Sequence, residues 1–149
     1  MRSVIICCSI SVADEALRIQ KELDGFGLEV EIPVGVKKYI ANNFTHATKE
    51  ESAKDKKDND LIRGYYEKMK SYDAVLIVNA EKNGIANYIG GNTFLEMAFA
   101  HVLNKSLYVL NPLPECSYLD ELRAMDPVIL DGDLSRLKKD MAGGQLSFA

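Results

Sequence analysis

The sequence predicts one α/β domain, residues 1–149, built on a doubly wound, five-stranded parallel sheet. Short apolar segments rich in β-branched residues alternate along the chain with amphipathic segments that have a helical period. That alternation is typical of a parallel sheet with helices on both faces, and five strands favour the flavodoxin-like or Rossmann-like order 2-1-3-4-5. A chain of 149 residues is also long enough to bury a core without disulfides or bound metal.

The N-terminal part of the chain carries two predicted strands and a helix. Ser3–Ser9 is short and almost wholly apolar, as buried strands are. A helix opened by Ser11 or Asp14 follows it and ends near Gly25. Leu28–Ile32 alternates apolar and acidic residues, which predicts a second, less buried strand.

Residues 37–60 interrupt this pattern, because the segment is highly charged and poor in apolar residues after Phe44. Most of the charge lies in the run Lys49–Asp60. Its composition indicates either a solvated, mobile face or a lid with a role in ligand binding. A third interpretation makes this run the docking surface of a protein-interaction module.

The pattern of strands and helices resumes after the charged run. Leu61–Ser71 has apolar residues at i, i+3, i+4 and i+7, which predicts a helix, and Ala74–Val78 reads as a buried strand. An Asn- and Gly-rich stretch, Asn79–Asn92, comes next. Thr93–Leu103 is a helix so apolar on nearly all sides that we expect it, with His101, to lie in the core. The remaining elements are a strand at Leu107–Leu110, a helix at Tyr118–Met125, a strand at Val128–Leu130 and a helix at Leu134–Met141.

The charge and the apolar runs of the sequence argue against nucleic acids and membranes as binding partners. A net charge of −4 and a pI near 5.2 argue against a nucleic-acid backbone as the main partner, which needs clustered Lys and Arg. No apolar run approaches the length of a membrane span, and the run after Arg2 is too short for a signal peptide. We therefore expect no membrane partner and a cytoplasmic protein.

The cysteines and the glycines argue against bound metals and common cofactors. Cys7 and Cys8 are adjacent in a strand, so their side chains point to opposite faces and make a poor disulfide, and Cys116 is distant in sequence. We expect reduced thiols that pack as small hydrophobic groups. No CxxC spacing indicates zinc, and no GxxxxGK[ST] or GxGxxG loop is present, so no metal and no cofactor is expected.

Two loops are predicted to form the ligand site. In such sheets, ligands bind outside the carboxyl ends of the strands where the strand order reverses, and there Cys8–Ser11 meets Asn79–Asn92. Loops this long are often functional. Glycines allow close backbone approach, asparagines form hydrogen bonds, and Tyr88 offers a ring on which a flat base can stack. An ordinary long turn with Asn and Gly at positive φ would have the same composition.

Glu96 is the one carboxylate in an otherwise apolar helix. Thr93 lies three residues before it, and Thr-x-x-Glu fits a capping box that needs no function. The functional interpretation places Glu96 in the first turn of the helix, facing the ligand. There the helix N-terminus favours the ionised carboxylate that a nucleophile or a sugar-hydroxyl acceptor needs.

Two stretches, Asp73-Ala-Val-Leu-Ile-Val-Asn79 and Gly90-Gly-Asn-Thr-Phe-Leu-Glu96-Met-Ala-Phe-Ala100, resemble the nucleoside 2-deoxyribosyltransferase family. Members of this N-deoxyribosyltransferase and nucleotide N-glycosidase superfamily carry an aspartate that opens a hydrophobic strand, a loop, and a helix beginning Gly-Thr-x-x-Glu-x-Gly-x-Ala. Their following Lys-Pro-strand segment is similar to Lys105–Leu110. The resemblance runs from Asp73 to about Pro112, so the chain looks like a divergent member.

The resemblance implies cleavage or transfer of the N-glycosidic bond of a nucleoside or nucleotide. Glu96 matches the family's nucleophile, which attacks the anomeric carbon of the sugar. The base leaves, and a second base or water resolves the glycosyl-enzyme, as in retaining glycosidases. A homodimer or larger homo-oligomer is also implied. The substrate-binding residues on this interpretation are Ser9, Ser11, Asn79, Tyr88, Gly90, Gly91, Asn92 and Thr93.

Two positions depart from the family pattern. Members usually have an acidic residue eight positions before the strand-opening aspartate, where this chain has Tyr65. They often have Asp or Ser six positions before the glutamate, where this chain has Gly90. Tyr65 or Tyr88 is then the candidate proton donor to the departing base, a transfer typically worth about 10²- to 10⁴-fold in rate. The missing acid also favours an alternative, a domain that binds or senses a nucleotide without catalysis.

Overall fold

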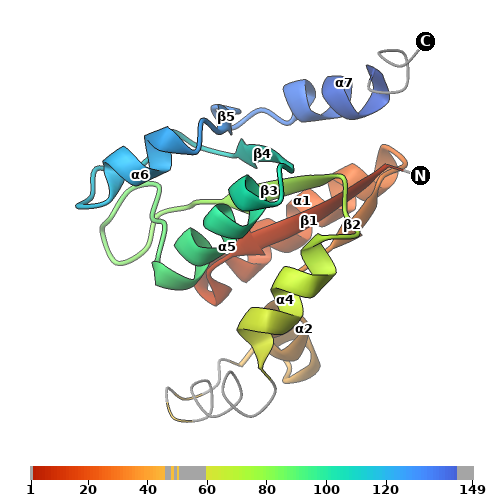
Figure 1. The fold of residues 1–149 in the computed structure, drawn as a ribbon. Coiled ribbons are helices and arrows are strands. Elements are labelled where there is room, and N and C mark those ends of the chain that lie inside the picture. Colours follow the sequence, from red (N-terminus) through yellow and green to blue (C-terminus); the bar gives the residue numbers. More distant parts are fainter. Residues whose placement is uncertain (1, 46–47, 49, 51–59, 144–149) are drawn as a thin grey trace.

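A five-stranded sheet forms the centre of the protein (Figure 1). The computed structural model describes residues 2–45, 48, 50 and 60–143. All pairings in the sheet are parallel and the strand order is β2-β1-β3-β4-β5, which confirms the predicted doubly wound α/β fold. The strands are β1 (Ser3–Cys8), β2 (Glu29–Glu31), β3 (Ala74–Val78), β4 (Ser106–Val109) and β5 (Val128–Ile129).

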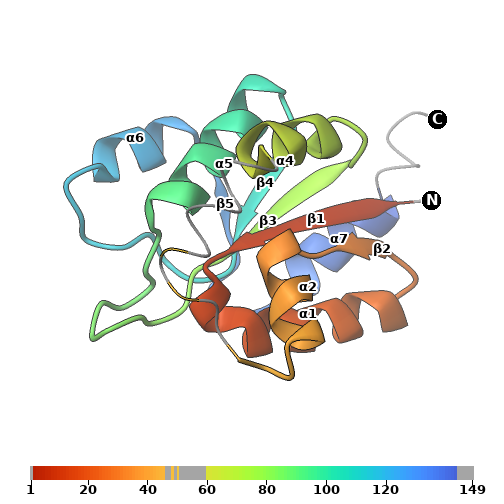
Figure 2. The ribbon, with the colours of Figure 1, turned by 90° about the horizontal axis from the view of Figure 1, so that it is seen from below.

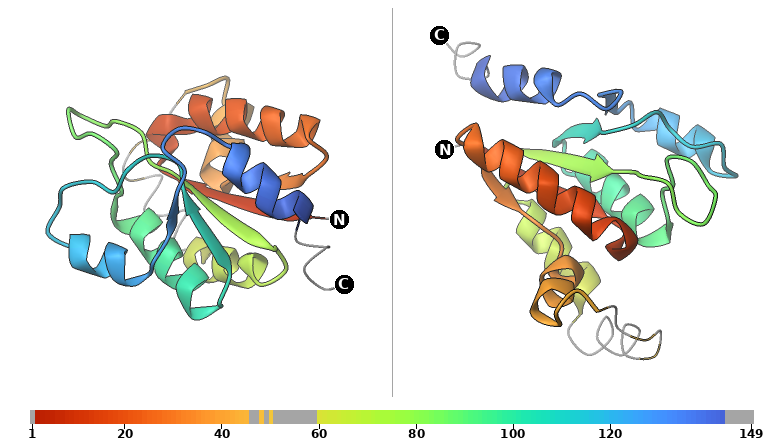
Figure 3. Two further views of the ribbon diagram at one scale, coloured as in Figure 1. Left: turned by 90° about the horizontal axis from the view of Figure 1, so that it is seen from above. Right: turned by 180° about the vertical axis from the view of Figure 1, so that it is seen from behind.

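Helices cover both faces of the sheet, as Figure 2 and Figure 3 show. Helices α1, α2 and α7 pack on one face, and α4, α5 and α6 pack on the other. A short 3₁₀ helix, η1, joins β1 to α1. The helical elements are η1 (Ile10–Val12), α1 (Ala13–Gly25), α2 (Val34–Ala41), α4 (Leu61–Met69), α5 (Gly91–Val102), α6 (Leu119–Ala124) and α7 (Ser135–Gly143).

Strand β1 is buried along its whole length and separates the two halves of the core. Its side chains alternate between the faces, so Ile6 and Cys8 pack on the α1 side while Ile5 and Cys7 pack on the α4 and α5 side. The opposite orientation of the two adjacent thiols is as predicted. Cys7, Cys8 and Cys116 are all free cysteines.

Helix α2 is absent from the predicted elements. Pro33 lies two residues past the end of β2 and is the N-cap of a helix in which only Val36 is buried. A proline is well tolerated at a helix start because that position needs no amide donor. Gly35 lets this helix lie against η1, since a Cβ there would stand 2.5 Å from Ile10 Cδ1. The proposed lid or solvated face at 37–60 begins in α2, and half of it, residues 46–47, 49 and 51–59, lies outside the described residues.

Helix α5 differs from its prediction in start and in burial. It begins at Gly91, two residues earlier than the predicted start at Thr93. It is not buried on all sides, because only the face toward the sheet is covered: Leu95 is 44% exposed and Val102 is 71% exposed. His101 is exposed as well, so its predicted place in the core is wrong.

Candidate active site

The carboxyl ends of β1 and β3 lie side by side, because Cys8 at the end of β1 pairs with Val78 at the end of β3. Helix α1 leaves this edge over one face of the sheet, and α5 leaves it over the other. This is the point where the strand order reverses, which is where open α/β sheets bind ligands. Two loops meet here, residues 9–12 and residues 79–90.

Glu96 is the one charged side chain that is buried within the described part of the chain, with 7% of its surface exposed. It lies close to Cys7, Cys8 and Tyr65. Burial is the main reason that the pKa of each of these three groups is raised, and the negative charge of Glu96 raises it further. Burying a carboxylate costs free energy, and perturbed ionisable groups cluster at functional sites, so its place beneath the ligand edge of the sheet makes Glu96 the candidate functional group.

The start of α5 corrects two expectations about Glu96. Gly90 is the N-cap, and no side chain forms a capping hydrogen bond there. Thr93 is therefore a residue within the helix, and the capping-box interpretation is wrong. Glu96 stands in the second turn and not in the first, which holds no acidic residue. Gly91 and Asn92 are exposed in that first turn, and Thr93 is buried.

The two thiols beside Glu96 are poor nucleophiles. Burial, with the charge of Glu96 as a further cause, raises the pKa of Cys7 well above its usual range and that of Cys8 to about 12. A thiol with so high a pKa stays protonated at neutral pH, and the thiolate is the reactive form. Among these neighbouring groups, the carboxylate of Glu96 is the one suited to attack an electrophilic carbon.

Tyr65 of α4 forms a hydrogen bond to β1 beyond the point where β1 stops pairing with β2. Strand β1 last pairs with β2 at Ile5, opposite Glu31, but continues beside β3 as far as Cys8. The Tyr65 hydroxyl donates to the Ile6 carbonyl oxygen at 2.5 Å. Burial first, then the nearby Cys7 and Glu96, raises the pKa of this phenol well above its usual range. Tyr65 is therefore a weak acid whose proton is bound to a backbone carbonyl, and both facts argue against it as the proton donor.

Asn79 is fully buried and bonds to the loop that follows β4. Its Nδ2 donates to the carbonyls of Asn111 and Pro112, both at 3.1 Å, and its Oδ1 accepts from the Asn111 N–H at 2.9 Å. Asn111 Nδ2 donates in return to the Asn79 carbonyl at 2.8 Å. The side chain of Asn79 therefore holds two loops together, and this set of bonds disfavours the substrate contact predicted for it.

Ser9 and Ser11 come together at the end of β1, and Lys82 joins them from the loop after β3. The two hydroxyl oxygens lie 2.9 Å apart, and Lys82 Nζ lies 3.4 Å from Ser9 Oγ. Lys82 is not among the predicted site residues. A lone lysine in an Asn- and Gly-rich loop carries no motif, and only the folded loop brings it to a serine 73 positions away.

Tyr88 is placed by its neighbours on the same loop. Lys82 Nζ lies over its ring, 5.2 Å from the centroid. A Cβ on Gly90 would stand 2.9 Å from Tyr88 Cε2 and 3.0 Å from its hydroxyl oxygen, so the ring lies against the backbone at the N-cap of α5. The ring is held at the helix N-terminus, where it can offer a face to a base. The close approach also accounts for glycine at position 90.

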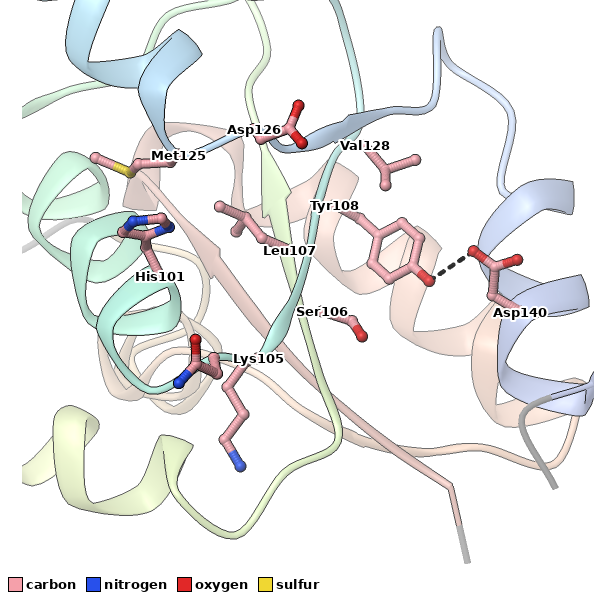
Figure 4. Close-up of a pocket in the computed structure, with 10 residues that line it drawn as sticks. His101, Lys105, Ser106, Leu107, Tyr108, Met125, Asp126, Val128 and Asp140 are labelled. Atoms are coloured by element: carbon pink, nitrogen blue, oxygen red, sulfur yellow. Dashed lines mark hydrogen bonds between the residues drawn. The ribbon is translucent and has the colours of Figure 1, made fainter. Parts of the chain in front are cut away.

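A cavity of about 410 Å³ lies at the opposite, amino-terminal edge of the sheet (Figure 4). It is bounded by the C-terminal ends of α5 and α6, which carry partial negative charge and disfavour anions. Three of its polar side chains are already engaged, since Tyr108 donates to Asp140 and Lys105 donates to the Lys70 carbonyl. Glu96, Ser9 and Ser11 are not among the residues that line it. The buried carboxylate therefore favours the carboxyl edge as the functional one.

Comparison with known proteins adds no family to this description. No protein-family model, no curated protein and no solved structure matches the chain.

None of the helices in the described ranges has the length and apolar character needed to cross a membrane.

Proposed function

We propose that the protein cleaves or transfers the N-glycosidic bond of a nucleoside or nucleotide, with Glu96 as the nucleophile. The observation that carries this proposal is the burial of Glu96 at the edge where β1 and β3 end. The resemblance of residues 73–112 to nucleoside 2-deoxyribosyltransferases supports it, since Glu96 occupies the position of the family's nucleophile.

The reaction on this proposal has two displacements. A carboxylate oxygen of Glu96 attacks the anomeric carbon, the carbon–nitrogen bond breaks, and its electron pair leaves with the base. The base takes a proton from water or from the Tyr88 hydroxyl. Water or a second base then attacks the same carbon, gives up a proton, and releases the Glu96 carboxylate. Asn92 and the backbone of the 79–90 loop hold the sugar.

Trapping tests the proposal directly. A 2-fluoro-sugar nucleoside slows the second displacement, so intact-mass and peptide mass spectrometry are expected to find a glycosyl adduct on Glu96. Glu96→Ala should lose both the adduct and the release of free base. Glu121→Gln, which alters an exposed carboxylate on α6, is the control and should keep both. Undiminished base release by Glu96→Ala would refute the proposed chemistry.

A second candidate function is nucleotide binding or sensing without catalysis. It is favoured by Tyr65, which stands where relatives have an acid and whose proton is held by the Ile6 carbonyl. A ligand at 100 times its Kd stabilises the fold by about 2.7 kcal/mol, which a thermal-shift assay detects. A nucleotide that stabilises the protein and is recovered intact supports sensing, whereas recovery of free base supports the enzyme.

The expected partner is thus a small molecule, and the resemblance also leads us to propose a homodimer or larger homo-oligomer. The protomer has a mass of 16.6 kDa. Light scattering that returns this mass at working concentrations would contradict the oligomer.

A further inference from the structure

We propose that Ser9, Ser11 and Lys82 form a subsite for one phosphate group, so that the substrate is a nucleoside monophosphate rather than a nucleoside. This inference rests on the proposed function, which leaves the phosphorylation state of the substrate open. It assigns a role to Lys82, to which the proposed chemistry gives none.

The three side chains converge from two loops on neighbouring strands. Ser9 follows Cys8 at the end of β1, and Lys82 follows β3, whose last residue pairs with Cys8. Ser9 Oγ accepts from the Ser11 N–H at 3.3 Å and lies 2.9 Å from Ser11 Oγ. Lys82 Nζ reaches the same oxygen at 3.4 Å. One ammonium group and two hydroxyls therefore share one small volume.

Lys82 is held in place before any ligand binds. Its backbone pairs with Ile85 in both directions, at 3.0 and 2.9 Å, which closes the tip of the loop. Its ammonium group lies over the Tyr88 ring. A cation that is already ordered loses less entropy when it binds an anion than a free surface lysine does.

The charge of Lys82 has no carboxylate partner among the residues that the structure describes. The neighbouring Glu81 accepts from the Gly84 N–H at 2.9 Å instead. Lys82 meets only neutral acceptors at the site, the Ser9 hydroxyl and the Tyr88 ring. Lys37 and Lys68, by contrast, both pair with the carboxylate of Glu31. The arrangement at Lys82 thus favours an anion supplied by the ligand.

The chemistry of the cluster fits a single phosphate. Phosphate oxygens accept from ammonium and hydroxyl donors together, and charge-assisted hydrogen bonds of this kind are about twice as strong as neutral ones. One lysine with two serines matches one phosphate, whereas a diphosphate or triphosphate would need further cations. The subsite lies at the same edge of the sheet as the start of α5, the helix that carries Glu96, because Ser9 directly follows Cys8 at the end of β1.

The test measures binding in a Glu96→Ala background, so that turnover does not interfere. The probes are inorganic phosphate, a panel of nucleoside 5′-monophosphates, and the matching nucleosides. Lys82→Met keeps the side-chain stem over Tyr88 but removes the charge. We expect it to weaken monophosphate binding by about 10- to 100-fold, as the loss of a charged hydrogen bond predicts. Nucleoside binding should change little. Lys139→Met, on the exposed surface of α7, is the control and should leave both unchanged.

A second variant separates a phosphate contact from a loss of folding. Ser9→Ala with Ser11→Ala should also weaken the monophosphate more than the nucleoside, while circular dichroism stays that of the native protein. If Lys82→Met weakens the binding of monophosphates and of nucleosides by the same factor, the subsite is overturned. Lys82 would then act only through the conformation of the loop.

The subsite and the proposed function fail in different ways. If the enzyme cleaves nucleosides through Glu96 and a 5′-phosphate brings no gain in kcat/KM, the subsite is refuted and the proposed function stands. If inorganic phosphate binds in a Lys82-dependent manner but the protein with Glu96 intact releases base from no member of the panel, the subsite stands and the proposed chemistry fails. Absence of binding by every probe at millimolar concentration refutes both.

Discussion

Asn79 and Asn111 exchange hydrogen bonds across the ends of β3 and β4. The Asn111 N–H donates to Asn79 Oδ1 at 2.9 Å, and Asn111 Nδ2 donates to the Asn79 carbonyl at 2.8 Å. Each residue uses its side chain to satisfy the backbone of the other. The pair therefore fixes the starting points of the 79–90 loop, which borders the candidate active site, and of the loop that follows β4.

Asn79→Ala should lower the free energy of unfolding by about 2–4 kcal/mol, because it leaves buried backbone groups without partners. Asn79→Asp should also destabilise, since a carboxylate cannot donate to the Asn111 and Pro112 carbonyls. Urea unfolding measures both changes. Asn92→Ala alters an exposed asparagine and should stay within about 0.5 kcal/mol of the parent protein. A parent-like Asn79→Ala would show that the pair does not hold the loops.

Tyr65→Phe distinguishes a structural phenol from a catalytic one. The variant leaves the Ile6 carbonyl without its donor, so we expect a loss of about 1–3 kcal/mol in stability by urea unfolding. Base release at saturating substrate should stay close to the parent rate below the unfolding transition. If Tyr65 were the proton donor, kcat would instead fall by about 10²- to 10⁴-fold. Such a fall would contradict the role assigned here.

Glu31 links β2 to two helices and should make stability depend on pH. It bonds Lys37 of α2 at 2.7 Å and Lys68 of α4 at 2.8 Å. Burial opposes its ionisation, but the hydrogen bonds and charges of the two lysines outweigh burial and lower the pKa of Glu31. Because the folded-state pKa lies below the unfolded one, near about 4.3, the stabilisation is present above that pH. It is lost as the pH falls through the folded-state value.

Comparison with Glu31→Gln measures this dependence. At pH 7 the variant should be less stable by about 1 kcal/mol, an amount kept small because both lysine partners are partly exposed. The difference between the two proteins in urea unfolding should shrink as the pH falls below about 4. A gap that stays constant down to pH 3 would show that the ion pairs contribute nothing to stability.

Gly90→Ala should disturb Tyr88 without disturbing the helix. A Cβ at position 90 would stand 2.9 Å from the Tyr88 ring, so the ring has to move. If Tyr88 stacks on the base, the variant should weaken nucleoside binding by about 10-fold or more, consistent with about 1–3 kcal/mol for stacking. Gly64→Ala meets no atom within 4 Å on α4 and is the matched control, expected to stabilise slightly. Isothermal titration measures both, and unchanged affinity in Gly90→Ala would exclude Tyr88 from the base site.

The alternation of short apolar segments with amphipathic helical segments predicts the parallel sheet and its two-faced core, and the strand order follows from the usual topology of five-stranded sheets of this kind. The residues at which helices begin and end are harder to predict. Thr93-x-x-Glu96 matches the pattern of a capping box, yet α5 begins earlier, at Gly91. A glycine has no side chain that could mark the start of a helix. Pro33, two residues past β2, is the N-cap of α2, a helix that the apolar pattern of the sequence does not predict.

The site is predictable where it follows from topology and unpredictable where it depends on loop conformation. Glu96 is identified from its isolation in an apolar helix, and its burial is consistent with that choice. The Lys82 contact with Ser9 depends on a turn closed by Ile85, which no local pattern encodes. The hydrogen bond from Tyr65 to the Ile6 carbonyl likewise depends on where the pairing of β1 with β2 ends. Patterns in the sequence place such a boundary only approximately.

The bond between Tyr65 and Ile6 has a consequence for how the protein opens locally. Helices at the surface of a domain can detach at a lower free-energy cost than the strands of its core, and amide hydrogen exchange reports the difference. Here the Tyr65 hydroxyl of α4 donates to the Ile6 carbonyl in the fully buried strand β1. Helix α4 therefore cannot leave the sheet without breaking a buried hydrogen bond, and its amides should exchange nearly as slowly as those of β1. In Tyr65→Phe the amides of α4 should exchange faster while those of β1 stay protected.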